Sequence, residues 1–157
     1  IISENICKIF CDINNINLTI LRCFAFSGPL QLNNKNYAIP NIIRQFKSSI
    51  HKEVKINGSG KDLRSFMNQK DLGKSLFKIL ISKKKYKIYN IGSNEKISIF
   101  GLANKIKKIL RSKKKIIIEK PKSNFVNYVP SIKRLKKIGI SEIITLDQTI
   151  KEMLDLK

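Results

Sequence analysis

The sequence predicts a single α/β domain. Segments whose apolar residues recur at helical spacing alternate along the chain with short apolar segments of strand length. Residues 18–26, LTILRCFAF, form a nearly continuous apolar run, which is typical of a parallel strand that is buried on both faces. The chain has 157 residues, of which 42% are hydrophobic, so it is long enough for one domain with a core but not comfortably for two.

The first third of the chain is expected to hold a helix, the buried strand and a second helix. Residues 4–13 carry a stripe of apolar side chains with the spacing of an amphipathic helix. The strand at 18–26 stops at the Ser-Gly-Pro sequence of residues 27–29. After a polar loop at 31–36, the second helix begins near Pro40, because proline suits the first turn of a helix.

We expect the rest of the chain to be organised around residues 54–72, VKINGSGKDLRSFMNQKDL. This stretch begins with a short apolar strand, and Gly58 and Gly60 then permit a tight turn. Asn68, with Asp71 three residues later, predicts the capped start of a helix that ends near residue 82. The apolar residues of that helix are Leu72, Leu76, Phe77 and Leu80.

Arg64 lies between the glycine turn and the capped helix, flanked by Leu63 and Phe66, two residues that favour burial. A planar, permanently charged guanidinium suits a diphosphate or a carboxylate, which would make this stretch an anion-binding frame. The alternative is a structural ion pair with Asp62 or Asp71. The neighbouring residues favour neither interpretation over the other.

The second half of the chain is expected to continue the alternation of strands and helices. Residues 85–91 predict a second core strand, which a Gly-Ser-Asn turn closes at residues 92–94. The remaining expected elements are a short strand at 97–99, a helix over 102–110, a third strand at 116–118, a small helix around 135–138 and a last helix over 146–154.

The cysteine pattern favours a reducing, cytoplasmic location. Cys7, Cys11 and Cys23 lack metal-type spacing, and the first two lie one helical turn apart among apolar neighbours, which predicts buried free thiols. His51 is the only histidine and is expected at the surface. No signal peptide is visible and no apolar run approaches the roughly 18 to 20 residues of a membrane span, so no membrane partner is expected.

The net charge of +21 requires an explanation, because a basic stripe or arm would indicate a nucleic-acid partner. Lysines are spread through every segment, with short runs at 83–85 and 113–115 where elements are expected to meet. Aromatic residues are not interleaved with them as a base-stacking surface would require. We therefore expect a solvated basic surface and no specific nucleic-acid partner.

The residues predict a binding site without reactive groups. The sequence has no histidine beside a nucleophile, no metal-binding cluster and no GxGxxG after a first strand. Polar loops follow three of the expected strands, at residues 27–29, 57–61 and 92–95. Because ligands of open α/β sheets bind outside the carboxyl ends of the strands, these loops are expected to line one pocket for an anionic ligand.

Five segments resemble motifs of a known family. They are LRCFAFSGP, AIPNIIRQ, VKINGSGKDLRSF, YNIGSNEKISI and YVPSIKRLKKIGI. In this order they resemble the C-terminal half of the extended short-chain dehydrogenase/reductase family, specifically its NAD-dependent nucleotide-sugar epimerases and dTDP-glucose 4,6-dehydratase-like members. The resemblance covers about residues 3–154, and the third segment, with its strand, glycine turn and arginine, is the most specific match.

The resemblance implies a Rossmann-type fold with NAD as cofactor. Residues 1–157 would supply its C-terminal portion, namely the last strands of the parallel sheet and a small α/β substrate-binding domain. The implied site residues are Cys23 and Phe24 at the nicotinamide end of NAD, Arg64 and Asn94 at the diphosphate, Tyr37 and Ala38 beside the nucleotide, and Ile56 and Asn57 against the base.

The sequence departs from the family pattern at several positions. Ala25 stands where many members have an asparagine that touches the substrate, and Asn57 stands where an aromatic residue is common near the base. Asn127, just before Tyr128, replaces an arginine found in some members. These departures leave the sugar and the base of the substrate open, and they are compatible with a divergent or inactive member.

The family's GxxGxxG and Tyr-x-x-x-Lys motifs do not occur in the sequence. In the family, a segment resembling residues 3–5 follows shortly after that lysine, so the dinucleotide-binding part and the catalytic pair are expected upstream of residue 1. The chain alone is therefore expected to be inactive.

The resemblance thus implies the nucleotide-sugar-binding part of an NAD-dependent nucleotide-sugar 4,6-dehydratase or epimerase, a lyase or isomerase that could form a homodimer when intact. One alternative is a regulatory module of the same fold that binds nucleotides without chemistry. A second alternative is a basic nucleic-acid-binding domain. Nucleoside diphosphates are the expected ligands of the first two, whereas the third would bind polynucleotides in a salt-sensitive way.

Overall fold

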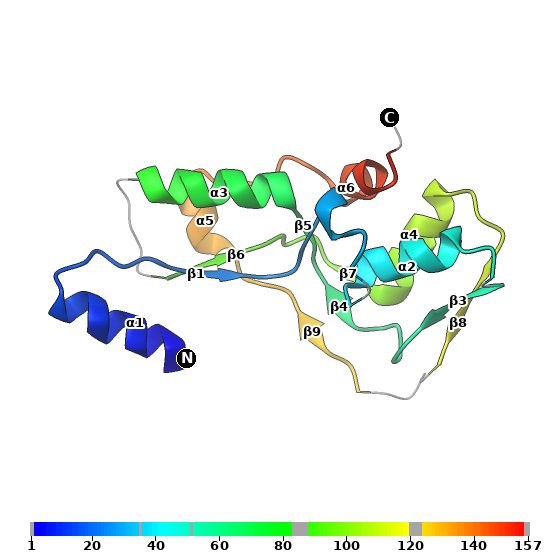
Figure 1. Ribbon diagram of the computed structural model, residues 1–157, viewed down its shortest axis with the longest axis horizontal. Coiled ribbons are helices and arrows are strands. Elements are labelled where there is room, and N and C mark those ends of the chain that lie inside the picture. Colours follow the sequence, from blue (N-terminus) through cyan, green and yellow to red (C-terminus); the bar gives the residue numbers. More distant parts are fainter. Residues whose placement is uncertain (1, 35, 51, 83–87, 120–123, 156–157) are drawn as a thin grey trace.

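The computed structural model describes residues 2–34, 36–50, 52–82, 88–119 and 124–155 (Figure 1). The helices are α1 (Ile2–Ile13), the 3-10 helix η1 (Pro29–Gln31), α2 (Ala38–Lys47), α3 (Gln69–Ile81), α4 (Ile99–Ile109), α5 (Lys133–Lys137) and α6 (Leu146–Met153). The strands are β1 (Ile20–Cys23), β2 (Phe26–Ser27), β3 (Glu53–Ile56), β4 (Leu63–Arg64), β5 (Met67–Asn68), β6 (Ile88–Ile91), β7 (Ile97–Ser98), β8 (Lys115–Ile118) and β9 (Asn127–Tyr128). This alternation of helices and strands confirms the predicted α/β class. His51, the lysine run at 83–85 and the first residues of the strand predicted at 85–91 lie outside the described residues.

The strands in the described ranges form four small sheets. β1 pairs with β6, β2 with β5 and β3 with β8, each pair in parallel, while β4 lies between antiparallel β7 and parallel β9. Figure 1 shows α3 and α5 with the β1–β6 pair toward one end of the molecule, and α2 and α4 with the β3–β8 pair toward the other. The parallel pairing was expected, but its division into separate sheets was not.

The strand predicted at 18–26 is in fact two strands that belong to different sheets. Phe24 still donates its backbone N–H to the carbonyl oxygen of Ile91 at 2.8 Å, beside the β1–β6 pair. One residue later, the carbonyl oxygen of Ala25 accepts from the N–H of Met67 at 3.0 Å, on the β2–β5 side. The prediction of burial on both faces is also wrong, because the last two residues of β1 are exposed.

The glycine turn after β3 is confirmed. Gly58 and Gly60 have φ angles of 83° and 70°, in the left-handed region that glycine adopts without steric cost. A Cβ atom on Gly60 would lie 3.3 Å from the Cβ of Phe100, and the N–H of Phe100 donates to the carbonyl oxygen of Gly60 at 2.9 Å. The turn therefore packs closely against the start of α4.

Two hydrophobic clusters form the core of the part of the chain that the structure describes. The first joins α2, β3, α4 and α6, and its buried residues are Ile39, Ile42, Ile43, Phe46, Val54, Ile56, Leu102, Ala103, Ile106, Leu146, Ile150, Met153 and Leu154. The second joins β5, α3, β6 and α5 with the segment after it, and its buried residues are Met67, Ile79, Tyr89, Ile91, Ile132, Leu135 and Ile140. Ser27 of β2 donates its hydroxyl to the sulfur of Met153 at 3.2 Å, so β2 is fastened to the first cluster.

Asn68 is the N-cap of α3, as predicted, and it also ties that helix to α6. Its Oδ1 accepts from the N–H of Lys70 at 2.8 Å, while its Nδ2 donates to Thr149 Oγ1 at 3.0 Å and to Glu152 Oε2 at 3.1 Å. Because Asn68 is fully buried, these bonds satisfy polar atoms that water does not reach.

Asp71 does not help to cap α3, contrary to the prediction. Its buried carboxylate accepts two hydrogen bonds through Oδ2, from the N–H groups of Ile143 and Ile144, each at 2.8 Å. The residue is therefore an anchor for the segment that precedes α6.

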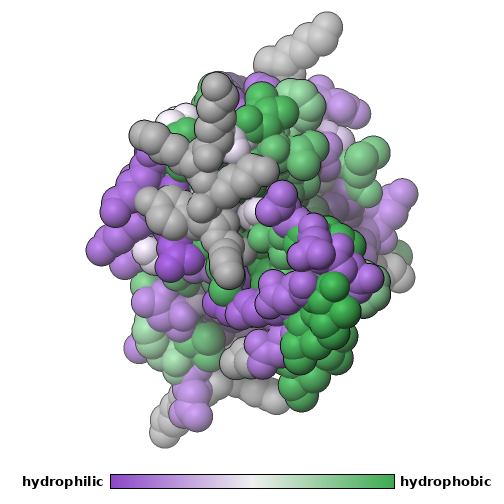
Figure 2. All heavy atoms as spheres, turned by 90° about the vertical axis from the view of Figure 1, so that its left-hand side faces the viewer, coloured by the Kyte–Doolittle hydropathy of each residue, from purple (hydrophilic) through white to green (hydrophobic). Residues whose placement is uncertain are grey.

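Apolar side chains remain exposed on α1 and α3. The exposed residues of α1 are Ile2, Ile6, Ile9, Phe10 and Ile13, and those of α3 are Leu76, Phe77, Leu80 and Ile81. On α3 the buried positions are instead Asp71, Ser75 and Ile79. Figure 2, viewed from the side where α1 and the end of α3 lie, shows hydrophobic patches on the surface.

The thiol prediction is correct for Cys11 and wrong for Cys7. All three cysteines are free, but Cys7 and Cys23 are exposed and only Cys11 is buried. The reason is that no large part of α1 is covered by another element in the described structure, so that its apolar stripe marks an exposed face. None of the helices in the described ranges combines the length and apolar character needed to cross a membrane.

These exposed faces predict self-association of the 157-residue chain. The groove between β1 and α3 has a volume of about 590 Å³ and includes Leu76, Phe77 and Leu80. Exposed apolar surface of this kind, beside a strand that has an unpaired edge, favours contact with other chains. We expect sedimentation velocity to show oligomers whose size increases with concentration, and the double variant Phe77→Glu/Leu80→Glu to reduce them.

The matched control is Leu30→Glu, which makes the same change at a leucine that is 90% exposed but lies on η1. This variant should associate like the parent chain. A parent chain that stays monomeric at all concentrations and melts cooperatively would contradict the prediction.

Candidate functional site

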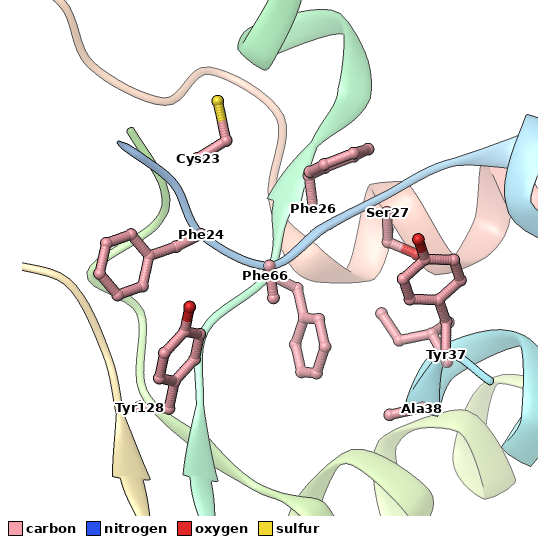
Figure 3. Close-up of a pocket in the computed structure, with 10 residues that line it drawn as sticks. Cys23, Phe24, Phe26, Ser27, Tyr37, Ala38, Phe66 and Tyr128 are labelled. Atoms are coloured by element: carbon pink, nitrogen blue, oxygen red, sulfur yellow. The ribbon is translucent and has the colours of Figure 1, made fainter. Parts of the chain in front are cut away.

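A pocket of about 270 Å³ lies where the chain leaves β1 and where α2 begins (Figure 3). Its lining residues are Cys23, Phe24, Ala25, Phe26, Ser27, Tyr37, Ala38, Ile39, Phe66 and Tyr128. Most of these side chains are aromatic or aliphatic. The pocket is therefore a concave, largely apolar surface with few polar groups, as small-molecule sites commonly are.

Two tyrosines form the rim of this pocket. Tyr37 is the N-cap residue of α2, and its carbonyl oxygen accepts the N–H of Asn41 at 3.0 Å. Tyr128 is on β9, where the parallel register places it beside Arg64 of β4. In Figure 3 the rings of Tyr128 and Phe66 stand on one side of the pocket and Tyr37 stands on the other. Tyr37 and Tyr128 are each nearly half exposed, so both are accessible to a ligand.

Tyr128 connects the pocket to Arg64. Its ring centroid lies 4.9 Å from that of Phe24, and the two ring planes are inclined by 35°. The Cζ atom of Arg64 lies 5.6 Å from the centroid of the same tyrosine ring, which is within cation–π range. Arg64 also donates from Nη1 to the carbonyl oxygen of Leu63 at 3.1 Å.

The ion pairs considered for Arg64 are not formed among the described residues. Asp62 Oδ1 instead accepts the N–H of Val126 at 2.9 Å, and the carboxylate of Asp71 faces the 143–144 backbone. Arg64 thus has an aromatic neighbour and a backbone partner, and its charge is not neutralised by either aspartate.

Four of the expected site residues come together in this pocket, namely Cys23, Phe24, Tyr37 and Ala38. Arg64 lies beside it through its contact with Tyr128. This grouping brings the end of β1 together with the start of α2, and the roles of these residues stay predictions.

The other three expected site residues lie outside this pocket. Ile56 is only 3% exposed and belongs to the first core cluster, so its side chain is not available to a base. Asn57 is exposed after the end of β3. Asn94 is exposed as well, and its N–H donates to Glu142 Oε1 at 3.2 Å. Their contacts with a ligand remain predictions.

The three polar loops do not line one pocket as expected. Within the described residues, Ser27 is part of the lining, whereas the loops at 57–61 and 92–95 contribute no lining residue. For the loop at 57–61 the physical reason is the division of the sheet, whereas the loop at 92–95 follows β6, the sheet neighbour of β1. The rule for carboxyl ends applies to neighbouring strands of one sheet, and β3 pairs with β8 in a sheet separate from β1–β6.

Two polar side chains of the pocket, Ser27 and Cys23, are poorly suited to act as nucleophiles. The Ser27 hydroxyl already donates to the sulfur of Met153. The thiol of Cys23 is near the pocket wall, and burial raises its pKa although the residue as a whole is exposed. A protonated thiol is a weak nucleophile. The described part of the chain also brings together no group of three metal-ligating His, Cys, Asp or Glu side chains.

The carboxyl of Glu142 accepts a hydrogen bond from the loop that carries Asn94, and its protonation gives a test of that contact. Burial raises the pKa of the Glu142 carboxyl above its ordinary value of 4.5, and the nearby charges of Glu95 and Asp71 add to this effect, although hydrogen bonds from Ser93 and Asn94 oppose it. The folded state therefore binds the proton more tightly than the unfolded state does. The protonated Glu142 carboxyl therefore contributes to the free energy of unfolding below pH 4.5. This contribution is lost as the pH rises through the raised pKa of Glu142.

We accordingly expect Glu142→Gln to raise the melting temperature at neutral pH and to have little effect in acid, where the carboxyl is protonated. Glu53→Gln is the control, because Glu53 is an exposed carboxylate on β3. Melting curves recorded by circular dichroism across the pH range would test this expectation. A Glu142→Gln variant that is less stable than the parent at neutral pH would show that the charged form is needed.

Sequence reasoning missed Tyr128 and Phe66 as parts of the pocket. Phe66 was expected only to be buried beside Arg64, and Tyr128 was noted only as the neighbour of Asn127. Tyr128 reaches the pocket because β9, a strand of two residues, pairs with β4. A strand this short has no periodicity that a sequence pattern could reveal.

The structure is an α/β fold with parallel strand pairs and an aromatic pocket after its first strand, and comparisons with known proteins identify its family. Residues 1–92 match the model of the NAD dependent epimerase/dehydratase family. This match covers more than half of the chain, so the chain belongs to that family, as its resemblance to nucleotide-sugar epimerases and dehydratases indicated. A search of curated proteins found no match.

Solved structures share the fold at low sequence identity. UDP-glucose 4-epimerase from Thermotoga maritima, solved with UDP-glucose, is 18% identical with a TM-score of 0.84, over 98% of this chain and 50% of that one. A mutant UDP-glucuronic acid 4-epimerase from Bacillus cereus, solved with a fluorinated UDP-sugar and NAD, is 22% identical with a TM-score of 0.84, over 97% and 48%. TunA, an NAD dependent NDP-hexosamine 5,6-dehydratase, is 17% identical with a TM-score of 0.73, over 89% and 45%. The chain thus spans about half the length of these proteins.

Proposed function

We propose that this chain supplies the nucleotide-sugar-binding part of an NAD-dependent nucleotide-sugar 4,6-dehydratase or epimerase. The observation that carries the proposal is the pocket in which Cys23, Phe24, Tyr37 and Ala38 meet, with Arg64 beside it, whose charge no acidic side chain of the described residues neutralises. An apolar recess beside a guanidinium suits a ligand with a flat or apolar part joined to a diphosphate. Family membership supports the same ligand class.

The residues present fit NAD only in part. Cys23 and Phe24 offer a thiol and an aromatic ring at one end of the pocket, where a nicotinamide ring would lie. When bound, NAD would supply the hydride acceptor for oxidation of the sugar at C4. The sequence contains no GxxGxxG, so a glycine cradle for the pyrophosphate of NAD is not among these residues. The chain's own part is to bind and orient the nucleotide sugar.

Binding by the 157-residue chain tests the proposal. We expect saturable binding of UDP-glucose or dTDP-glucose by calorimetry at low protein concentration, and loss of that binding in Ala38→Trp, whose indole fills the pocket. Ser49→Trp adds the same side chain at an exposed position outside the pocket and should bind like the parent. If neither nucleotide sugar binds, or if Ala38→Trp binds normally, the proposed pocket is wrong.

We also expect no turnover by this chain alone. The sequence has no Tyr-x-x-x-Lys pair, and the described pocket residues include no activated base. Incubation with NAD and a panel of nucleotide sugars should give no keto-sugar and no epimer. Reproducible product that requires the protein would place the reactive groups within this chain.

Assays of ligand binding and of turnover also distinguish two other functions. A regulatory module of this fold would bind nucleoside diphosphates yet show no turnover within the intact protein. A nucleic-acid-binding domain would bind polynucleotides at physiological salt, whereas a solvated basic coat binds them only weakly and at low salt. The cytoplasmic location and the homodimer of the intact protein stay predictions.

A further inference from the structure

We propose that Tyr128 is a positioning residue that holds the Arg64 guanidinium for a diphosphate. The inference rests on the proposed function and deepens it, because it names a residue through which the binding arginine is oriented. Sequence reasoning gave Tyr128 no role, and its position between the pocket and Arg64 comes from the structure alone.

The sheet register fixes the two side chains beside each other. Arg64 and Tyr128 are direct partners in the parallel β4–β9 pair, as are Leu63 and Asn127. Cross-strand partners project from the same face of a sheet, so their side chains are neighbours. The backbone of β9 is held further by the N–H of Leu63, which donates to the carbonyl oxygen of Val126 at 2.9 Å. The contact between Arg64 and Tyr128 is thus set by the fold rather than by a flexible loop.

Phe24 also packs against the tyrosine ring. Its centroid lies 4.9 Å from that of Tyr128, in a tilted aromatic pair. Gly92 permits this approach, because a Cβ there would lie 3.0 Å from the Cβ of Phe24 and 2.9 Å from the Cγ of Pro130. The segment that carries Tyr128 can therefore pack close to Phe24 only where residue 92 has no side chain.

The arrangement leaves the polar edge of the guanidinium available. The Cζ atom of Arg64 lies over the ring of Tyr128, 5.6 Å from its centroid, and the ring carries no opposite charge that would neutralise the guanidinium. Of the five donors of an arginine, only Nη1 has a hydrogen-bond acceptor among the described residues, the carbonyl oxygen of Leu63. Tyr128 thus limits the rotation of the guanidinium without neutralising it, which suits an anion that accepts paired hydrogen bonds.

The experiment measures whether Tyr128 acts through Arg64. The 157-residue chain and the variants Tyr128→Leu, Tyr128→Phe, Arg64→Ala and Tyr128→Leu/Arg64→Ala are titrated with UDP and with uridine. Phe125→Leu is the matched control, because Phe125 is an exposed aromatic residue on the same segment but outside the pocket lining. Melting temperatures recorded in parallel show whether each variant is folded.

We expect Tyr128→Leu to weaken UDP binding roughly threefold to fivefold more than it weakens uridine binding, the range of an exposed cation–π contact. Tyr128→Phe keeps the ring and should bind UDP like the parent, as should Phe125→Leu. In the Arg64→Ala background, Tyr128→Leu should weaken UDP binding no more than it weakens uridine binding, because the group it orients is gone.

Three results would overturn the inference in different ways. Equal UDP affinity of the parent and Tyr128→Leu would show that the ring does not position Arg64. If Tyr128→Leu lowers UDP affinity equally in the parent and in the Arg64→Ala background, Tyr128 only lines the pocket and does not position Arg64. A parent chain that binds no UDP would remove the proposed function, and this inference with it.

Discussion

Replacement of Arg64 by alanine is expected to weaken nucleoside-diphosphate binding roughly tenfold to a hundredfold. Hydrogen bonds to charged groups contribute about 1.5–3 kcal/mol, and a diphosphate beside Arg64 would lose such bonds. Arg64→Lys should lose most of the same affinity, because a single ammonium cannot present two parallel N–H groups in a plane. The structure sharpens this expectation, since neither Asp62 nor Asp71 pairs with Arg64 in the described residues.

A matched variant separates the loss of a binding group from the loss of one positive charge. Arg44→Ala removes the same charge from an exposed position on α2, where Nη2 donates to Asn41 Oδ1 at 3.2 Å, its one partner among the described residues. This variant should bind UDP almost like the parent. Calorimetric affinities and melting temperatures of all three variants decide the outcome. If Arg64→Ala lowers the melting temperature but leaves the affinity of the folded protein unchanged, Arg64 is a structural residue and the ligand lies elsewhere.

Replacement of Asp71 by alanine is expected to be the most destabilising single change of those considered. Two backbone N–H groups, of Ile143 and Ile144, donate to one carboxylate oxygen at 2.8 Å. Hydrogen bonds to a charged group contribute about 1.5–3 kcal/mol each, and since these are only partly buried we expect a loss of about 2–4 kcal/mol of unfolding free energy. For a domain of this size, such a loss lowers the melting temperature by roughly 5–15 °C.

Asp62→Ala is the matched control for this prediction. Among the described residues the Asp62 side chain accepts one hydrogen bond at a more exposed position, from the N–H of Val126 at 2.9 Å, so its loss should cost about 1 kcal/mol or less. Asp71→Asn, which keeps an acceptor oxygen without the charge, should be intermediate. Thermal unfolding followed by circular dichroism at low protein concentration measures these differences. Equal melting temperatures for Asp71→Ala and Asp62→Ala would show that the segment before α6 does not depend on its anchor.

Local signals in the sequence were sufficient for most helices and for the central turn. The N-cap Asn68 and the left-handed Gly58 and Gly60 were predicted because these residue types match a backbone requirement that neighbouring atoms impose. A capping box at the start of α6, formed by Thr145 and Gln148, has an equally local signature that was overlooked. Such features depend on a few adjacent residues, so a sequence pattern contains them completely.

The pocket was only partly predictable. Cys23, Phe24, Tyr37 and Ala38 were assigned through resemblance to a family, and they do lie together. The contribution of Tyr128 could not be anticipated, because its strand pairs with β4 across a separation of more than sixty residues. Pairing of that kind is decided by the whole packed structure, and no local propensity specifies it.

The sequence by itself determined where helices and turns form, and it determined the family. The tertiary structure alone decided that residues 18–26 divide between two sheets at Phe24, that α3 buries Asp71 and Ser75 while Leu76, Phe77 and Leu80 stay exposed, and that Arg64 faces an aromatic ring. The physical reason is that apolar periodicity indicates which side chains gain free energy from burial. It does not indicate which element covers them. Only the packing of distant segments settles which faces are covered and which pairs of side chains meet.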